Sequence, residues 1–264
     1  MQWIDMAHEQ TGGREIGINV HSQEQLMADL SARFLSQKGF CLATLNLDHV
    51  VKLKRSENFR KAYAQQTHVT ADGRPIVWLS SLAGHPVDLL PGSGIMTPMI
   101  ELAEKLQVPV AFFGSDKATL EQASKHLTAR FPRLKIVSLI APLMGFDPEG
   151  AQADAFIETL KQSGAGLVFI ALGAPKQEIF AHRAYTAAPQ IGFASIGAGV
   201  DFIAGTQTRA PRLVRALAAE WLWRLAGDPK RLMSRYLACF AILPALTRRA
   251  LQRRFAKSTD VQAR

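Results

Sequence analysis

Two kinds of hydrophobic pattern alternate along this chain. Short continuous apolar runs are typical of strands buried on both faces of a parallel sheet, and the clearest is LVFIAL at residues 167–172. Longer segments with apolar residues three and four positions apart are typical of helices that pack one face on a core, as at residues 22–37. From Val108 onward the two kinds follow one another at the spacing of βαβ units. The pattern predicts an α/β fold with a Rossmann-like parallel sheet.

The expected elements follow from these patterns. Strands are predicted at residues 40–50, 68–70, 108–114, 134–140, 167–172 and 191–198. Helices are predicted at residues 22–37, 50–66, 95–106, 115–131, 149–164 and 175–185, then at 209–237 with a break at Gly227-Asp228-Pro229, and in a final amphipathic helix to about Phe255. PGSG at 91–94 is typical of a loop, and the pattern does not distinguish helix from strand at 74–84. Residues 1–20 are expected to form a loose arm or a first edge strand.

The turn after the LVFIAL run is the first candidate site. Gly173 permits a sharp turn, and Pro175 can open a helix because its missing N–H would have no intrahelical partner. Lys176, Gln177 and Glu178 then place a cation, an amide and a carboxylate in the first helical turn. One interpretation is an ordinary strand–turn–helix with a solvated polar turn. The other is a helix start whose backbone N–H groups receive a nucleotide phosphate at the carboxyl end of the sheet.

A second polar group follows the apolar run that begins at Phe40. It contains Thr44, Asn46, Asp48 and His49, and Asp72 comes just past the next short apolar segment, in an ADG turn. A turn aspartate is common because Asp tolerates turn geometry. The functional interpretation is a general base at the carboxyl edge of the sheet. Position alone favours the turn aspartate.

Composition fits an ordinary globular protein. The chain has 264 residues, of which 48% are hydrophobic and 20% charged, enough for one large α/β domain or a domain with an appendage. Cys41 and Cys239 lie in apolar contexts without metal-ligand spacing, which fits a reducing cytosolic compartment. The sequence contains no GxGxxG and no GxxxxGK[ST], so classical dinucleotide and P-loop chemistry have no support.

The net charge of +9 is concentrated near the end of the chain. Between residues 224 and 264 the only acids are Asp228 and Asp260, and the basic residues are Arg224, Lys230, Arg231, Arg235, Arg248, Arg249, Arg253, Arg254, Lys257 and Arg264. Such a tail suggests anionic lipid or nucleic acid as a partner. No signal peptide is visible, and the apolar run at 236–246 is too short to span a bilayer. We therefore expect an α/β core at 1–227 and a basic amphipathic, membrane-associating helical appendage at 228–264.

Four stretches together resemble the WecG/TagA/CpsF family of bacterial glycosyltransferases. They are TLNLDHVVKL (44–53), ADGRPIVW (71–78), ALGAPKQE (171–178) and the long segment 197–235, which contains RAP, EWLWRL and DPKR. The family transfers a sugar from a nucleotide donor to a polyprenyl-diphosphate-linked acceptor. The resemblance thus implies an inverting transfer from a UDP-sugar in exopolysaccharide or other cell-surface polysaccharide synthesis. It also implies a cytoplasmic protein that is peripheral at the inner face of the plasma membrane.

The resemblance also implies roles for individual residues. Asp72 resembles the family's candidate base, which takes a proton from the acceptor hydroxyl. The implied substrate-binding residues are Thr44, Asn46, Gly173, Pro175, Lys176, Gln177, Glu178, Arg209 and Arg212. The last two are available for the diphosphate oxygens. The family has no DxD metal motif, and this sequence has none, so we expect no metal and no cofactor.

One departure from the family keeps other functions open. The family commonly shows Arg-x-x-Gly-x-Asp after the ADG turn, whereas this chain has Leu89 and Gly94 where Arg and Asp would stand. One alternative is a non-catalytic subunit of a polysaccharide assembly complex. Another is a nucleic-acid-binding protein, against which the tail interleaves arginines with apolar residues as interfacial helices do, and no RNA-binding fingerprint is present. A homo-oligomer remains possible.

Overall fold

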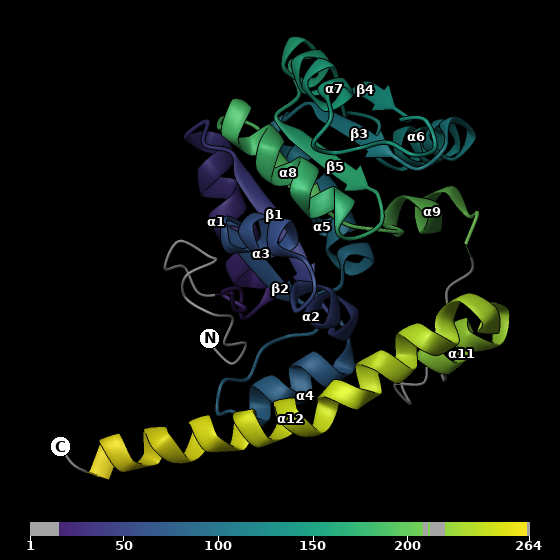
Figure 1. The fold of residues 1–264 in the computed structure, drawn as a ribbon. Coiled ribbons are helices and arrows are strands. Elements are labelled where there is room, and N and C mark those ends of the chain that lie inside the picture. Colours follow the sequence, from purple (N-terminus) through teal and green to yellow (C-terminus); the bar gives the residue numbers. More distant parts are fainter. Residues whose placement is uncertain (1–15, 208–210, 212–219, 263–264) are drawn as a thin grey trace.

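The computed structural model describes residues 16–207, 211 and 220–262. Its centre is one six-stranded sheet with the strand order β2-β1-β6-β5-β3-β4, in which every neighbouring pair is parallel (Figure 1). The strands are β1 (Phe40–Leu45), β2 (His68–Ala71), β3 (Val110–Gly114), β4 (Ile136–Ile140), β5 (Leu167–Ala171) and β6 (Gly192–Ser195). β5 is buried along its whole length, as its continuous apolar run predicts. The predicted Rossmann-like α/β fold is confirmed.

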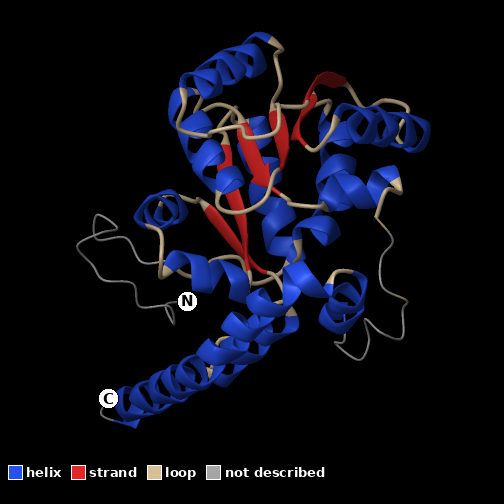
Figure 2. Ribbon diagram, turned by 45° about the vertical axis from the view of Figure 1, so that its right-hand side comes forward, coloured by secondary structure: helices blue, strands red, loops and turns tan. Residues whose placement is uncertain are grey.

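Helices cover both faces of the sheet (Figure 2). One face carries α1 (Gln23–Leu35), α5 (Gly92–Leu106), α6 (Lys117–Arg130) and α9 (Gly199–Ala204). The other face carries α3 (Glu57–Ala64), α7 (Ala151–Gln162) and α8 (Lys176–Ala187). Each face of the sheet forms a hydrophobic core with the helices that cover it. Alternate residues of a strand point to opposite faces, so Phe112 belongs to the core on the first face and Phe113 to the core on the second. The sheet is therefore the middle of three layers.

A third core lies beside β1 and β2, where α2 (Leu47–Leu53) and α4 (Arg74–Leu82) meet the long C-terminal helix. After α11 (Glu220–Gly227), that helix, α12, runs over Pro229–Gln262 below α4 and α2 (Figure 1). Leu246 and Ala250 of α12 are 2% and 0% exposed within this core. Part of the segment expected to associate with a membrane therefore packs on the protein instead, Leu246 included. No helix of the described residues is long and apolar enough to cross a membrane.

An asparagine cap divides the first predicted strand. The pattern predicts one strand over 40–50, but β1 ends at Leu45 and α2 begins at Leu47. The Oδ1 of Asn46 accepts a hydrogen bond from the backbone N–H of His49 at 2.9 Å. This bond satisfies a donor that the first turn of a helix leaves unpaired, so the chain turns into a helix as soon as the strand ends.

A second cap divides the predicted helix at 50–66. Ser56 accepts from the backbone N–H of Phe59 at 3.2 Å and starts α3 there, so the segment forms two short helices, α2 and α3. The segment 74–84, which the pattern leaves undecided, forms α4. The final helix reaches Gln262 and is longer than predicted.

The PGSG segment at 91–94 is not a loop, because α5 begins at Gly92. A Cβ atom at Gly92 would lie 2.7 Å from the backbone oxygen of Ile196, closer than real Cβ contacts allow. Glycine is needed here so that the start of α5 can approach the turn after β6, and this need is tertiary rather than local. The helix start is thereby fixed against the carboxyl end of the sheet.

Candidate functional site

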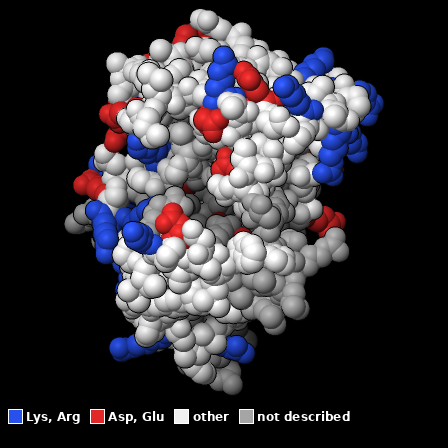
Figure 3. Space-filling model, turned by 90° about the vertical axis from the view of Figure 1, so that its right-hand side faces the viewer, with Lys and Arg blue, Asp and Glu red and all other residues white. Residues whose placement is uncertain are grey.

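The carboxyl ends of the six parallel strands meet along one edge of the sheet, where α/β proteins of this kind bind ligands. Four neighbouring strands, β2, β1, β6 and β5, bring their following turns together there. Figure 3 looks onto this side of the molecule and shows a surface hollowed near its middle, with acidic and basic side chains around it. Most of the candidate residues of the sequence analysis lie in these turns.

Asp72 and Asn46 meet at this edge. Asp72 directly follows β2, and its backbone N–H donates to the carbonyl of Leu45 at the end of β1, at 2.8 Å. The Nδ2 of Asn46 donates to the Asp72 Oδ2 at 3.2 Å. Because the Oδ1 of Asn46 is occupied as the cap of α2, its amide is held with the nitrogen toward the carboxylate. The half-buried carboxylate is thus held in one orientation at the sheet edge.

Thr44 lies in β1, two residues before Asn46. Its Cα pairs with that of Thr70 in β2, and the residue is 4% exposed. The strand therefore places Thr44 beneath the turn that carries Asn46 rather than on the open surface.

Two of the three polar residues in the first turn of α8 are buried, contrary to the interpretation as a solvated polar turn, and only Lys176 is exposed. Gln177 and Glu178 are 3% and 0% exposed. The Oε1 of Gln177 accepts from the backbone N–H of Gly197, just after β6, at 3.1 Å, and its Nε2 donates to the Glu178 Oε1 at 2.8 Å. Gln177 thereby ties the turn after β5 to the turn after β6. The Glu178 Oε2 is buried without a hydrogen-bond partner among the described residues.

Burial controls the charge of this cluster. Removal from water raises the pKa of the Glu178 carboxyl to about 7, since a charge is costly in the interior. The same effect lowers the pKa of His49 to about 3, so this imidazole is neutral at physiological pH. His49 Nδ1 lies 3.9 Å from the Glu178 Oε1 and 3.2 Å from the Tyr63 hydroxyl. The cluster is therefore a set of mostly neutral hydrogen-bonding groups rather than a buried ion pair.

The turn that precedes α8 is held from two directions. Gly173 is exposed, the Ala174–Pro175 peptide bond is cis, and α8 begins at Lys176, one residue after Pro175. The Nζ of Lys52 in α2 donates to the carbonyl of Ala174 at 2.9 Å. On the other side, the Nζ of Lys176 donates to the carbonyl of Phe146 in the loop before α7 at 2.6 Å. The turn is thus connected to α2 on one side and to the loop before α7 on the other.

The family of this chain follows from comparison with known proteins. Residues 14–258 match the family described as "Glycosyl transferase WecG/TagA/CpsF family". The chain belongs to this family. It is similar to an N-acetylglucosaminyldiphosphoundecaprenol N-acetyl-beta-D-mannosaminyltransferase of Bacillus spizizenii, with 25% identity over 207 residues that cover 78% of each chain. The resemblance seen in the sequence is confirmed, and the protein is a glycosyltransferase.

Not every expected residue of this WecG/TagA/CpsF-family glycosyltransferase falls in the described part of the chain. Arg209 and Arg212 lie outside the described residues. Leu89 and Gly94, which replace the family's Arg and Asp, stand in the loop before α5 and in its first turn. Leu89 is 38% exposed. Among residues 16–207, 211 and 220–262, no group of three or more His, Cys, Asp or Glu side chains is placed to hold a metal ion.

Two basic residues beside the site, Lys52 and Arg235, were not among the candidates predicted from the sequence. Lys52 Nζ and Arg235 Nη2 lie 2.8 and 2.9 Å from the same oxygen of Asp48, Oδ2. The spacing of Asp48 and Lys52, four residues apart, predicts an ion pair once the segment is known to be a helix. No local signal connects either residue with Arg235 in α12, since that contact depends on how the tail packs.

Proposed function

We propose that this glycosyltransferase moves a hexose or N-acetylhexosamine-type sugar from a UDP-sugar to a polyprenyl-diphosphate-linked saccharide, with inversion, in the synthesis of exopolysaccharide or another cell-surface polysaccharide. The family match supports glycosyl transfer. The Bacillus relative supports the acceptor and donor classes, because its name specifies a diphosphoundecaprenol-linked sugar and an N-acetylhexosamine. In this proposal, the enzyme works at the cytoplasmic face of the membrane that holds the acceptor.

The contact between Asp72 and Asn46 carries the mechanism. In an inverting transfer, the acceptor hydroxyl attacks the anomeric carbon from the face opposite the leaving diphosphate, and a base removes the hydroxyl proton. Asp72 is the proposed base, since its carboxylate is half-buried at the carboxyl edge and oriented at 3.2 Å by the Asn46 amide. The new C–O bond forms as the bond to the UDP oxygen breaks. Asn46 acts by holding the base in position.

The departing UDP carries negative charge that the site must stabilise. We assign this task to backbone N–H groups at the start of α8, to Arg209 and to Arg212. Helix starts favour anions because their N–H groups have no intrahelical partners. The burial of Gln177 and its bond to Gly197 give it a different task, which is to hold the two turns that border the donor. Arginines and a helix start can supply this stabilisation without a metal ion.

The exposed side chains of α12 suggest how the enzyme reaches an acceptor in the membrane. Leu237 and Phe240 of this helix are 60% and 46% exposed, and Arg248 and Arg249 are exposed as well. Exposed apolar side chains and arginines on one helix suit the interface of an anionic bilayer, where the apolar groups insert and the arginines meet headgroups. We propose that α12 brings the sheet edge to a polyprenyl acceptor that stays in the membrane.

A donor screen tests the proposed function. Purified full-length protein is incubated with a set of UDP-sugars and a synthetic prenyl-diphosphate-linked sugar, with and without EDTA. We expect transfer of one donor sugar with inverted anomeric configuration, and activity that EDTA leaves largely intact. Retention of configuration, or no transfer from any UDP-sugar, contradicts the proposed reaction. An absolute requirement for Mg²⁺ or Mn²⁺ contradicts the proposed stabilisation of the leaving group.

A further inference from the structure

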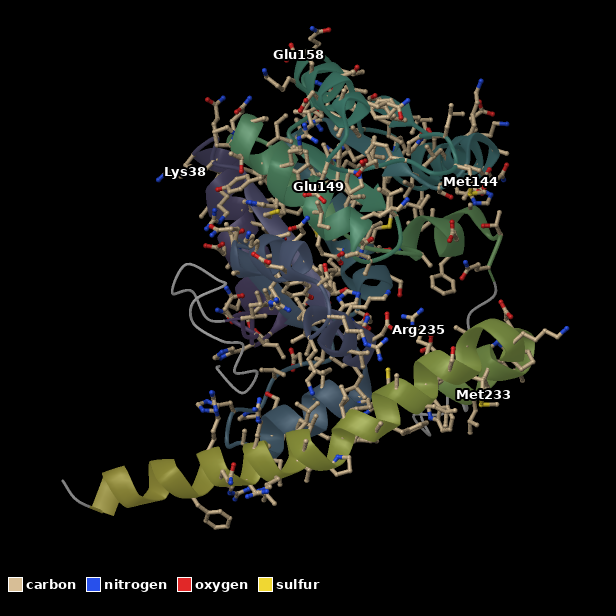
Figure 4. All side chains as sticks on the ribbon, viewed as in Figure 1. Lys38, Met144, Glu149, Glu158, Met233 and Arg235 are labelled. Carbon is tan, nitrogen blue, oxygen red and sulfur yellow. The ribbon has the colours of Figure 1, made fainter. Side chains whose placement is uncertain are left out.

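A single carboxylate oxygen joins the C-terminal helix to the sheet edge. The Asp48 Oδ2 lies 2.8 Å from Lys52 Nζ, one turn further along α2, and 2.9 Å from Arg235 Nη2 on α12. The Asp48 side chain is 10% exposed, whereas those of Lys52 and Arg235 are 34% and 45% exposed, so both pairs have a buried carboxylate and a partly solvated cation. Figure 4 shows Arg235 projecting from α12 toward the body of the protein.

Arg235 belongs to the face of α12 that packs on the protein. The residues of that face recur at helical spacing, and they are Leu232, Arg235, Cys239, Leu246 and Ala250. The four apolar members are each no more than 8% exposed. The Arg235 side chain is 45% exposed, and Arg248 and Arg249 are exposed on the same helix, but the Arg235 guanidinium reaches Asp48 of α2. Its charged end therefore contacts the protein.

Lys52 extends this contact to the candidate site. Its Nζ forms the ion pair with Asp48 and donates a hydrogen bond to the carbonyl of Ala174, at 2.9 Å, in the turn that opens α8. A continuous series of charge-assisted contacts therefore runs from α12 through Asp48 and Lys52 to that turn. Removal of the Asp48 charge leaves Lys52 and Arg235 as neighbouring cations that repel each other.

We infer that Asp48 is a positioning residue that couples the docking of the first half of α12 to the geometry of the Gly173–Pro175 turn. Leu246 and Ala250 hold the second half of α12 on α2 and α4 through apolar contacts, so loss of Asp48 loosens the helix without releasing it. Lys52 then still donates to the carbonyl of Ala174, but the Asp48 carboxylate no longer fixes the position of the Lys52 side chain. The inference rests on the proposed function only where activity is measured.

Hydrogen–deuterium exchange in the full-length protein tests the coupling independently of activity. The variants are Asp48→Asn, Arg235→Gln and Arg235→Lys. The control is Lys61→Gln, which removes an exposed ion pair to Glu57 on α3. We expect Asp48→Asn and Arg235→Gln each to speed exchange about tenfold in residues 229–240 and also in 173–178, as for loss of one charge-assisted contact. Arg235→Lys and the control should stay near wild type. Faster exchange in 229–240 alone, or in neither segment, overturns the inference.

A double-mutant cycle with a short-chain, water-soluble acceptor then separates positioning from direct substrate contact. If Arg235 acts through Asp48, each single variant loses about tenfold in kcat/KM, mainly through a higher donor KM, and the double variant loses little more. Arg235→Lys should recover most of the loss. Full additivity of the two losses means that Arg235 contacts the substrate directly, which overturns its assignment as a partner of Asp48. If the wild type transfers no sugar, the proposed function fails, and the exchange data still decide the inference.

Discussion

Asn46 uses both ends of one amide side chain, and the orientation of the proposed base depends on it. Its oxygen caps α2 and its nitrogen holds Asp72. An amide with both ends occupied has little freedom to rotate, so the carboxylate keeps one orientation without help from a bound ligand.

Replacement of Asp72 by Asn tests the base directly. The variant keeps the shape and the hydrogen-bonding capacity of the side chain but cannot accept the acceptor proton. We expect turnover to fall on the order of 10²-fold or more, while the fold and the affinity for donor stay near wild type. Steady-state kinetics and a donor titration measure the two effects. The matched control is Asp154→Asn, an exposed aspartate of α7, and near-wild-type turnover of the folded Asp72→Asn protein removes Asp72 from the mechanism.

The raised pKa of Glu178 should make the free energy of unfolding depend on pH. Its pKa is about 7 in the folded protein and near 4.5 when unfolded, so the folded state holds the proton more tightly. Stability from this group is complete below pH 4.5, is lost as pH rises to about 7, and is constant above that. Glu178→Gln keeps a neutral side chain that still accepts from Gln177. The variant should therefore gain stability relative to wild type between pH 5 and pH 8, by up to about 3 kcal/mol.

Urea unfolding of both proteins at pH 5 and pH 8 measures that difference. Comparison at the same pH cancels the contribution of His49, whose lowered pKa costs stability as pH falls below about 6.5. A difference that is the same at both pH values shows that Glu178 titrates normally in the folded state.

At the scale of elements, the start of α5 depends on close backbone approach. A Cβ at Gly92 would stand 2.7 Å from the carbonyl oxygen of Ile196, whereas one at Gly94 would meet only the ring of Pro91, at 3.2 Å. We expect Gly92→Ala to destabilise the protein by about 2 kcal/mol or more, since neither backbone can move freely. Gly94→Ala should be close to neutral because alanine favours the helix. Thermal melts of the two variants compare them, and equal melting temperatures contradict this account of the PGSG segment.

The sequence predicted elements well where local patterns decide, and less well where packing decides. The apolar run of β5 predicts a buried parallel strand, and the structure has one. The PGSG segment resembles a loop because the contact that requires Gly92 is with Ile196, more than a hundred residues away. Gln177 and Glu178 look solvated in the sequence, since the first turn of a helix is usually exposed. Their burial results from the packing of α8 on the sheet, which no local pattern encodes.

Parts of the candidate site were predictable for a similar reason. The turns after parallel strands always meet at one edge, so Asp72 and Asn46 could be expected there. Their direct hydrogen bond could not be expected, because it depends on the cap that ends β1 early. Asp48 and Lys52 belong to the TLNLDHVVKL stretch, but the sequence gives them no role. Their connection to Arg235 could not be predicted, because it depends on where α12 packs.

At the scale of the whole molecule, α12 divides its residues between the protein core and the surface. Truncation after Gly227 would uncover the core that Leu246 and Ala250 complete, so charge substitution is the cleaner test of membrane binding. We expect replacement of Arg248, Arg249, Arg253 and Arg254 by Gln to weaken binding to anionic liposomes about 10³-fold at low salt, at roughly 1 kcal/mol per residue. High salt should weaken wild-type binding in the same direction.

Co-sedimentation with liposomes of anionic and of neutral lipid measures this effect. The control replaces four basic residues elsewhere on the surface with Gln, which gives the same net charge, and these are Lys38, Lys61, Lys125 and Arg133. If both quadruple variants lose binding equally, net charge rather than α12 directs the protein to the membrane.

The contact of α12 with α2 and α4 also sets the order in which the chain can fold. Val50 and Ile76 are synthesised well over a hundred residues before the Leu246 and Ala250 that cover their cluster. Contacts so distant in sequence form late, because a long loop must close first. A nascent chain therefore exposes the apolar surface of α2 and α4 from early in synthesis until α12 has been made, even after the last strand of the sheet is complete. Chaperones that bind apolar segments would meet that surface for most of synthesis.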